Sequence, residues 1–219
     1  MINRKKSVDI KSGRCLIMTK RKPGFKLGVT GGIGSGKTSV CKVFDLLNIP
    51  VFSADREAAE IMEHDKGIIR NINAIAGKDL YSAGSLDKAE LARLIFNDKT
   101  LLEKVNLLVH PVVIDHFIKW VADQTSPYVI MEAAILFESG ASKFVDRIAT
   151  VVAPVEERVE RVIQRNKLSR DQVMARIRNQ MDDETRIKLS HYIIHNSEND
   201  MIIPAILEIH EDILKSINS

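Results

Sequence analysis

Near the start of the chain stands Gly31-Gly32-Ile33-Gly34-Ser35-Gly36-Lys37-Thr38, the stretch that decides the fold. The residues before it, Phe25 to Val29, predict a buried strand, and those after it, Ser39–Phe44, carry their apolar side chains on one side of a predicted helix. A Gly-x-x-x-x-Gly-Lys-Thr pattern between a strand and a helix is typical of a phosphate-binding loop, or P-loop. We therefore expect the chain to bind a nucleoside triphosphate.

Each residue type in this stretch has a physical reason. Glycines allow successive backbone N–H groups to point inward at phosphate oxygens, and the N-terminus of the next helix adds partial positive charge. Lys37 can reach the outer phosphates, and the Thr38 hydroxyl can ligate Mg²⁺. The predicted ATP-binding residues are Gly31, Gly32, Ile33, Gly34, Ser35, Gly36, Lys37, Thr38 and Ser39, with Thr38 as the metal ligand. The alternative, a glycine-rich turn without a ligand, is disfavoured by the flanking strand and helix.

Composition excludes several classes of protein. With 219 residues, of which 45% are hydrophobic and 28% charged, the chain is predicted to be soluble and globular, with one main domain. The longest apolar stretch, Tyr128 to Phe137, is shorter than the roughly 20 residues of a membrane-spanning helix, so no membrane span is expected. Two cysteines, Cys15 and Cys41, suggest neither a disulfide framework nor a zinc site, and fit a cytoplasmic location.

The positive charge of the chain is concentrated at its start. Residues 1–26 hold nine Lys or Arg residues and one acid, Asp9, so their charge of +8 leaves −5 of the total +3 for the rest. The globular part is therefore acidic, and no nucleic-acid partner is expected. We expect residues 1–25 to be a basic, disordered leader, or an extension upstream of a working start at Met18. The alternative for this segment is organelle targeting or nucleic-acid binding.

The order of predicted elements indicates an α/β fold. After the first strand and helix, short apolar runs predict further strands at 50–53, 128–131, 148–152 and 192–194. Helical patterns fill the chain from Asp55 to about Gln124 and then recur at 156–165, 170–181 and 202–217. Alternating strands and helices predict a five-stranded parallel sheet covered on both faces, as in the P-loop kinase fold.

The predicted kinase domain, 26–219, divides into a core and two helical parts. The segment between the second and third strands is too long for a simple crossover, and we expect it to form a substrate-binding insertion. The expected division is a core of 26–55, 125–154 and 186–219, an insertion at about 56–124 and a helical lid at about 155–185.

Other nucleotide-binding classes fit the sequence less well. GTPases need an Asn/Thr-Lys-x-Asp element, and neither Thr19–Lys22 nor Asn166–Ser169 supplies the Asp. A motor-type ATPase is expected to be larger and to end a strand in adjacent acids, whereas Tyr128–Glu132 ends in one. The size and the late Arg-rich helices favour a small-molecule kinase, which closes over its substrate to exclude water. A nucleotide-dependent binding or regulatory module is the alternative from a different class.

Beyond the P-loop, an ordered set of motifs resembles the dephospho-CoA kinase family over roughly Lys26 to Asn196. These motifs are Val51-Phe52-Ser53-Ala54-Asp55, Val109-His110-Pro111, Ile135-Leu136-Phe137-Glu138-Ser139-Gly140, Arg165 with Leu168-Ser169, Ala175-Arg176-Ile177 and Gln180-Met181. The resemblance implies transfer of the γ-phosphoryl group of ATP, with Mg²⁺, to the 3′-hydroxyl of dephospho-CoA, the last step of coenzyme A biosynthesis. The runner-up is another small-molecule or nucleoside kinase of the same fold. A monomer or small homo-oligomer is expected.

The resemblance also implies roles for single residues. The expected catalytic residues are Lys37, Asp55 and Arg165, and the expected substrate-binding residues are Asp55, His110, Arg161 and Arg176. Asp55 would orient or deprotonate the 3′-hydroxyl, although from position alone it could equally be the N-cap of the next helix. The chain departs from the family pattern at Ser53, where an acid is usual, at Glu132 and at Ser190-His191.

Three arginines, Arg158, Arg161 and Arg165, fall at i, i+3 and i+7, which places them on one helical face. Without further context they would pair with nearby glutamates on a solvated face, namely Glu156, Glu157 and Glu160. In a P-loop kinase, Arg165, with Arg161 beside it, would instead close over the transferring phosphoryl group.

Three more positions carry weaker expectations. His110 precedes Pro111 and predicts a helix boundary, with substrate contact as the alternative. Glu132 follows the third strand, where it would hold the Mg²⁺ shell through water or serve as a plain structural acid. Asn196 follows the last strand and would contact the nucleotide base.

Overall fold

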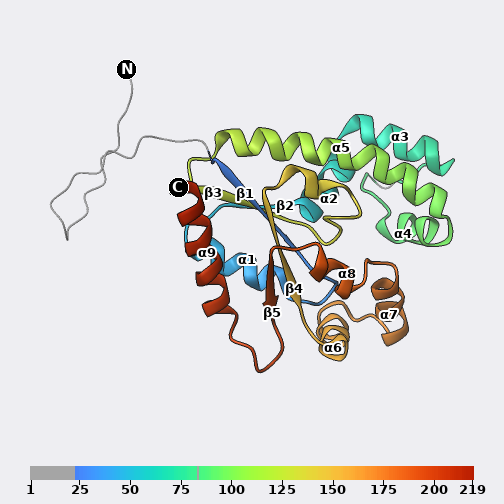
Figure 1. The fold of residues 1–219 in the computed structure, drawn as a ribbon. Helices are drawn as coiled ribbons and strands as arrows, with labels where there is room; N and C mark the ends of the chain where they lie inside the picture. The colour runs from blue at the N-terminus through green and yellow to red at the C-terminus, as the bar shows by residue number, and fades with distance from the viewer. Residues whose placement is uncertain (1–22, 83) are drawn as a thin grey trace, which may run out of the picture.

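The computed structural model describes residues 23–82 and 84–219, so the predictions for the first 22 residues of the leader fall outside the described part of the chain. Within that part, five parallel strands form one sheet in the order β2-β3-β1-β4-β5 (Figure 1). Their bounds are β1 Phe25–Thr30, β2 Val51–Ser53, β3 Tyr128–Glu132, β4 Arg147–Val152 and β5 Tyr192–His195. The predicted α/β fold with a five-stranded parallel sheet is confirmed.

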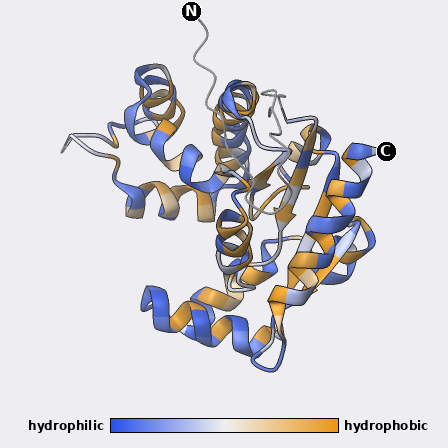
Figure 2. Ribbon diagram, turned by 90° about the vertical axis from the view of Figure 1, so that its left-hand side faces the viewer, coloured by the Kyte–Doolittle hydropathy of each residue, from blue (hydrophilic) through white to orange (hydrophobic). Residues whose placement is uncertain are grey.

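The strands are apolar because helices cover both faces of the sheet. All five residues of β3 are buried, and so are five of the six residues of β4. On one face lie α1 (Lys37–Leu46) and α9 (Ile202–Asn218), whose apolar side chains share a core cluster with β1, β3, β4 and β5. In Figure 2 the central strands are largely hydrophobic, while the helices around them carry residues of both kinds.

The other face of the sheet is covered by the helices between β2 and β3. They are α2 (Ala54–His64), α3 (Lys66–Ala76), α4 (Lys88–Asn97) and α5 (Lys99–Asp123). Side chains of α2, α3 and α5, such as Ile61, Ile72 and Val113, share one hydrophobic cluster with Val129 and Met131 of β3. Of the helices of the predicted insertion, α2 and α5 thus pack on the sheet, whereas α3 and α4 pack on α5.

A third group of helices follows β4. It comprises α6 (Val155–Asn166), α7 (Arg170–Arg178) and α8 (Asp183–Lys188), with the single 3₁₀ turn η1 (Ala141–Phe144) before β4. The helix predicted over 170–181 thus ends earlier, and α8 was not predicted. Val159, Val162 and Val173 form a small core of their own, against which Ile33 of the P-loop packs. This contact brings α6 and α7 to the end of the sheet at which the P-loop lies.

The predicted helix boundary at His110 is wrong, because α5 continues through Pro111. Its buried residues recur every four positions in one stripe: Leu101, Val105, Val109, Val113 and Phe117. Proline in a helix interior removes one hydrogen bond and costs about 3 kcal/mol, whereas burying each large apolar side chain contributes about 1.5–3 kcal/mol. The burial of the five side chains of this stripe therefore outweighs the tendency of Pro111 to interrupt the helix.

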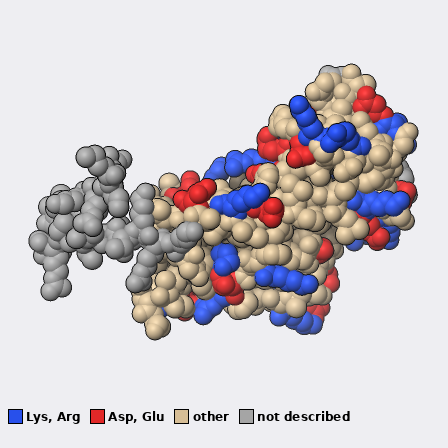
Figure 3. Space-filling view, turned by 90° about the horizontal axis from the view of Figure 1, so that it is seen from above, with Lys and Arg blue, Asp and Glu red and all other residues tan. Residues whose placement is uncertain are grey.

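Helix α5 also bears on the prediction that no segment spans a membrane. Among the described residues it is the one helix long and apolar enough to do so by length and composition, with a mean hydropathy of 1.2 over 18 residues. The core helix of a soluble protein passes the same test, and the stripe of α5 lies in the core cluster. The absence of a membrane span stays a prediction. Figure 3 views the molecule from the side of α5, where Lys and Arg are interspersed with Asp and Glu.

Candidate active site

The P-loop joins the end of β1 to the start of α1, as the sequence predicts. Gly34 and Gly36 have positive φ angles of 80° and 93°, a conformation that favours glycine. Their surroundings also exclude side chains: a Cβ on Gly34 would lie 2.5 Å from the backbone oxygen of Arg158, and one on Gly36 would lie 2.0 Å from Nδ2 of Asn196. The loop therefore needs glycine for both its curvature and its close packing.

Side chains from three later segments hold the backbone of this loop. Arg158 of α6 donates from Nε to the carbonyl oxygen of Ile33 at 2.9 Å, and the Ile33 N–H donates to Oε1 of Gln180 at 2.8 Å. Asn196, just after β5, donates from Nδ2 to the carbonyl oxygen of Ser35 at 2.7 Å. Sequence reasoning missed the first two contacts and gave Asn196 a different role. The shape of the loop is thus set by residues more than 100 positions away.

Lys37 lies at the start of α1 with its charge close to the loop. Its Nζ donates to the carbonyl oxygen of Gly31 at 2.9 Å. Burial lowers the pKa of Lys37, and the negative charges of Asp55 and Glu132 oppose this shift. The Lys37 ammonium group therefore interacts electrostatically with Asp55, just after β2, and with Glu132, the last residue of β3.

Thr38, the next residue, contacts Glu132 at the end of β3. The Thr38 Oγ1 donates to Oε1 of Glu132 at 3.0 Å. Hydroxyl and carboxylate oxygens are ligands that Mg²⁺ prefers, and Mg²⁺ is usually held by one or two carboxylates together with substrate phosphates. No group of three or more His, Cys, Asp or Glu residues in the described ranges could hold a metal by itself. The donor set fits a Mg²⁺ ion shared with a nucleotide.

Asp55 is the second residue of α2, close to the end of β2. Ser53 occupies the N-cap position of this helix, so the N-cap alternative for Asp55 is wrong. Its two carboxylate oxygens lie 3.4 and 3.3 Å from the backbone N of Ala134. Desolvation by the surrounding protein raises the pKa of Asp55 above its ordinary value of 3.8, and the charge of Lys37 opposes this. The carboxyl group is thus poised to hold a proton more readily than an ordinary aspartate.

A cavity of about 440 Å³ opens over the loop and contains most of the predicted site residues. It is lined by Ile33, Gly34, Gly36, Lys37, Thr38, Ser39, Asp55, Glu132, Ala134, Arg161, Val162, Arg165 and Gln180. Polar and charged side chains thus converge here from α1, α2, α6 and the end of β3. The volume is in the range of small-ligand sites.

A second, smaller cavity of about 50 Å³ adjoins Asp55 and is mostly apolar. It is lined by Ala54, Asp55, Ala58, His110, Val113, Ile114, Ala133, Ile135, Ser139 and Ala141. Burial lowers the pKa of His110, which favours the neutral imidazole in this wall. Among the residues that the structure describes, Asp55 is the one that lines both cavities.

The three arginines of α6 have different surroundings, although they share one helix. Arg158 is 2% exposed and donates from Nη1 to Oδ2 of Asp183 at 2.6 Å, not to one of the nearby glutamates. Arg161 donates to Oε2 of Glu157 and to the carbonyl oxygen of Asn196. Arg165 is exposed toward the cavity, with its Nε donating to Asn166. Only the last two line the cavity.

Other predicted residues do not reach the cavity wall. Gly31, Gly32 and Ser35 are buried within the loop, where their backbone shapes it. Arg176 is exposed on α7 and lines neither cavity, so its substrate contact stays a prediction. The site is therefore built by α1, α2, α5 and α6 around the carboxyl ends of β1, β2 and β3.

The family model and the curated relatives that match this chain are both described as dephospho-CoA kinase. The family model for dephospho-CoA kinase matches residues 25–201. A dephospho-CoA kinase of Bacteroides fragilis is 39% identical over 186 residues, which cover 84% of this chain and 91% of the relative. A solved structure from Thermus thermophilus is 30% identical, with a TM-score of 0.76 over 90% of this chain and 98% of that one.

A dephospho-CoA kinase from Campylobacter jejuni has a TM-score of 0.63 and is 24% identical, covering 87% of this chain and 98% of its own. At this identity the likeness shows a shared fold. The family match spans the P-loop, both cavities and the helices after β4. This chain therefore belongs to the dephospho-CoA kinase family.

Proposed function

We propose that the chain transfers the γ-phosphoryl group of ATP to the 3′-hydroxyl of dephospho-CoA, giving CoA and ADP. The observation that carries this proposal is the position of Asp55, which lines both the large polar cavity over the P-loop and the small apolar cavity beside it. A kinase must bring a donor and an acceptor together at one point. A carboxylate at the junction of two cavities fits that need.

In this proposal the acceptor hydroxyl lies at Asp55. The hydroxyl oxygen forms a bond to the γ-phosphorus while the bond between that phosphorus and the ADP oxygen breaks, and the hydroxyl proton passes to the carboxylate. Lys37 and the amides of the P-loop hold the phosphates of ATP. Arg165 and Arg161, which also line this cavity, would stabilise the charge on the transferring group.

The acceptor would extend into the apolar cavity. Its wall combines aliphatic side chains of α2 and α5 with His110, whose neutral imidazole can donate or accept one hydrogen bond. We propose His110 as an acceptor contact on this basis. The helices of 56–124 then form the acceptor side, and those of 155–185 form a lid on the ATP side.

We further propose Mg²⁺ as the cofactor, with the Thr38 hydroxyl as its protein ligand and Glu132 fixing that hydroxyl and the surrounding water. When bound, the ion would neutralise charge on the outer phosphates. We also propose a cytoplasmic location, which agrees with the free, buried Cys41. The mixed charge of the face in Figure 3 agrees with the absence of a nucleic-acid partner, and a monomer or small homo-oligomer stays a prediction.

The test is ADP release by the purified chain with Mg-ATP and dephospho-CoA. Parallel reactions contain adenosine, a nucleoside monophosphate or no acceptor, and the products are identified by mass. We expect ADP only with dephospho-CoA, together with a product identical to CoA. If turnover is faster with another acceptor, the assignment of dephospho-CoA as the substrate is wrong, and the chain is a different kinase of the same fold.

A further inference from the structure

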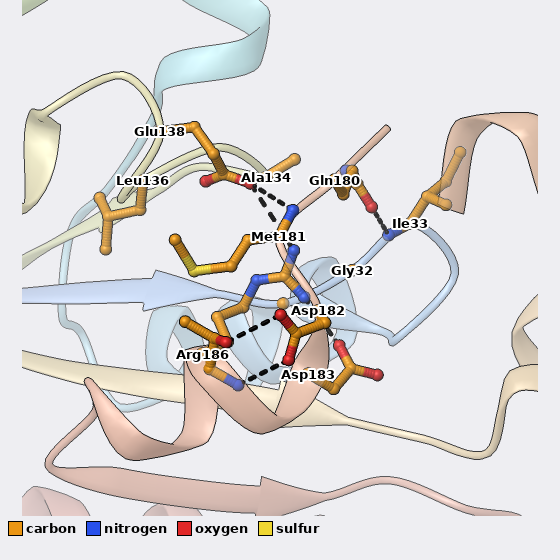
Figure 4. Close-up of polar contacts among 12 residues, drawn as sticks. Gly32, Ile33, Ala134, Leu136, Glu138, Gln180, Met181, Asp182, Asp183 and Arg186 are labelled. Carbon is orange, nitrogen blue, oxygen red and sulfur yellow. Dashed lines mark hydrogen bonds and ion pairs between the residues drawn. The ribbon is translucent and has the colours of Figure 1, made fainter. Parts of the chain in front are cut away.

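A ring of contacts surrounds the link between α7 and α8, residues 179–182, which we name the connector. The ring passes through Ile33 of the P-loop, Gln180 and Met181 of the connector, Glu138, Arg186, Asp183 and Arg158. In Figure 4, Gln180 points to Ile33 on one side of the connector, and Glu138 points to Met181 and Arg186 on the other. Segments far apart in the sequence are thus joined in one path, which is open only between Glu138 and Arg186.

On the nucleotide side, the ring holds both polar groups of one P-loop residue. The Ile33 N–H donates to Oε1 of Gln180 at 2.8 Å, and the Ile33 carbonyl oxygen accepts from Nε of Arg158 at 2.9 Å. Ile33 and Gln180 also line the large cavity. The orientation of the two peptide groups at Ile33 therefore depends on where the ring places Gln180 and Arg158.

On the other side, the ring includes Glu138, which lies in the segment after β3 that contributes residues to the acceptor wall. Glu138 accepts at Oε1 from the Met181 N–H at 3.0 Å. Two residues of the same segment, Ile135 and Ser139, line the small apolar cavity. The contact with the P-loop and the contact with Glu138 are made by adjacent residues, Gln180 and Met181. A shift of the wall is thus transmitted over a short distance.

The ring is one hydrogen bond short of closure at Arg186. This side chain is 0% exposed, and its Nη1 donates to Oδ1 of Asp183 at 2.7 Å. Its Nε and Nη2 have no hydrogen-bond partner in the described part of the chain, and Oε1 of Glu138 lies 3.8 Å from Nη2. A hydrogen bond requires a separation of about 3 Å, so a shift of roughly 1 Å at Glu138 would complete it. Because buried donors without acceptors are unfavourable, the closed ring is favoured once the wall moves.

We propose that Glu138 and Gln180 are positioning residues that couple the two substrate sites. An acceptor in the apolar cavity presses the wall toward Arg186, Glu138 completes the ring, and the ring fixes Ile33 for the nucleotide. Acceptor and nucleotide then bind with positive cooperativity, and the effect is reciprocal. This inference rests on the proposed function, in that dephospho-CoA is taken as the acceptor.

The test measures the affinity for an ATP analogue with an imido group between the β- and γ-phosphorus atoms, which cannot transfer its phosphoryl group. Calorimetric titrations are made with and without saturating dephospho-CoA. We expect the parent chain to bind the analogue at least about fivefold more tightly with the acceptor present. In Gln180→Ala this factor is expected to fall toward one. In Glu138→Gln it should fall because a neutral amide oxygen binds the Arg186 guanidinium less strongly than a carboxylate does. Glu184→Gln, which alters an exposed residue of α8 paired with Lys188, should keep the full factor.

Several outcomes separate this inference from other effects. The titrations use saturating dephospho-CoA. A variant that binds dephospho-CoA more weakly therefore needs a higher concentration of it, but the ratio of the two analogue affinities does not change. Thermal unfolding of each variant identifies loss of fold; Glu138→Gln keeps an oxygen acceptor for the Met181 N–H and should remain folded. A factor near one in the parent chain, or an unchanged factor in both variants, would overturn the inference. If the parent does not phosphorylate dephospho-CoA in the turnover assay, the proposed function fails instead.

Discussion

Thr38 donates its hydroxyl hydrogen to Glu132 across 3.0 Å, and this contact joins the first turn of α1 to the end of β3. Glu132 is 9% exposed and is paired in register with Val29 of β1 and Ser53 of β2. The three strands that carry the site therefore fix the carboxylate, and the carboxylate fixes the hydroxyl. This arrangement orients an oxygen ligand before any ion arrives.

Glu132→Gln should therefore weaken the use of Mg²⁺ more than it weakens catalysis. The amide keeps the shape of the side chain but removes the charge that orients Thr38 and water around the ion. We expect the half-saturating Mg²⁺ concentration to rise about 10-fold or more, with kcat at saturating Mg²⁺ changed much less. Initial rates over a Mg²⁺ titration measure both. Glu208→Gln, on the exposed side of α9, is the control, and equal Mg²⁺ curves for parent and Glu132→Gln would exclude the role.

Asp55→Asn should reduce kcat by about 10²- to 10⁴-fold, the usual contribution of a positioned base. The variant keeps the size of the side chain, and the P-loop contacts do not involve residue 55. The dissociation constant of ATP should therefore change by less than about twofold, because binding and proton transfer use different groups. Steady-state rates and a direct ATP titration check the two parts. A variant with the turnover of the parent would show that Asp55 is not the base.

The pH profile gives a separate test of the same residue. Desolvation raises the pKa of Asp55 above 3.8. Only the ionised carboxylate accepts a proton, so kcat/KM should fall as the pH drops through this raised pKa. The acid limb of the profile should thus lie above pH 3.8 in the parent and be missing in Asp55→Asn. If the acid limb persists unchanged in Asp55→Asn, a group other than Asp55 is responsible for it.

Arg165→Ala should lower kcat by about 10³-fold, because this guanidinium is the exposed cation on the cavity wall of α6. The matched control is Arg178→Ala, since Arg178 is also exposed on a helix of this region but lines neither cavity. We expect the control to retain nearly full turnover. Rates and thermal unfolding of both variants are compared. If Arg165→Ala keeps its turnover and loses only thermal stability, the residue has a structural role.

The sequence predicted the fold and the centre of the site because both have local signatures. The glycines and Lys37 of the P-loop lie within eight positions, and apolar runs define each strand. Asp55 follows β2 closely and Glu132 is the last residue of β3, and the carboxyl ends of parallel strands meet at one edge of the sheet. Their convergence with the P-loop therefore follows from strand order alone.

The side chains that hold the P-loop in place have no such local signature in the sequence. The contact of Arg158 with Asp183 and that of Gln180 with Ile33 join residues 25 and 147 positions apart. Helical spacing grouped Arg158 with Arg165, although one is buried and the other lines the cavity. Likewise Arg186 stands in the polar helix Asp183–Lys188, and nothing in that pattern predicts a fully buried guanidinium. Such burial depends on how distant segments pack.

The helix at Pro111 leads to a prediction about stability. Pro111 has no N–H to donate to the carbonyl oxygen of Leu107, so α5 lacks one internal hydrogen bond. Pro111→Ala should restore this bond and raise the free energy of unfolding by about 1–3 kcal/mol, with part of the gain offset by the greater entropy of the unfolded chain. Pro204→Ala is the matched control: Pro204 lies in the first turn of α9, where N–H groups have no partner in the helix, so no bond is gained. Urea unfolding measures the free energy of unfolding of both variants, provided that its dependence on urea concentration is similar in the two. Equal changes in this free energy would contradict a missing hydrogen bond at Leu107.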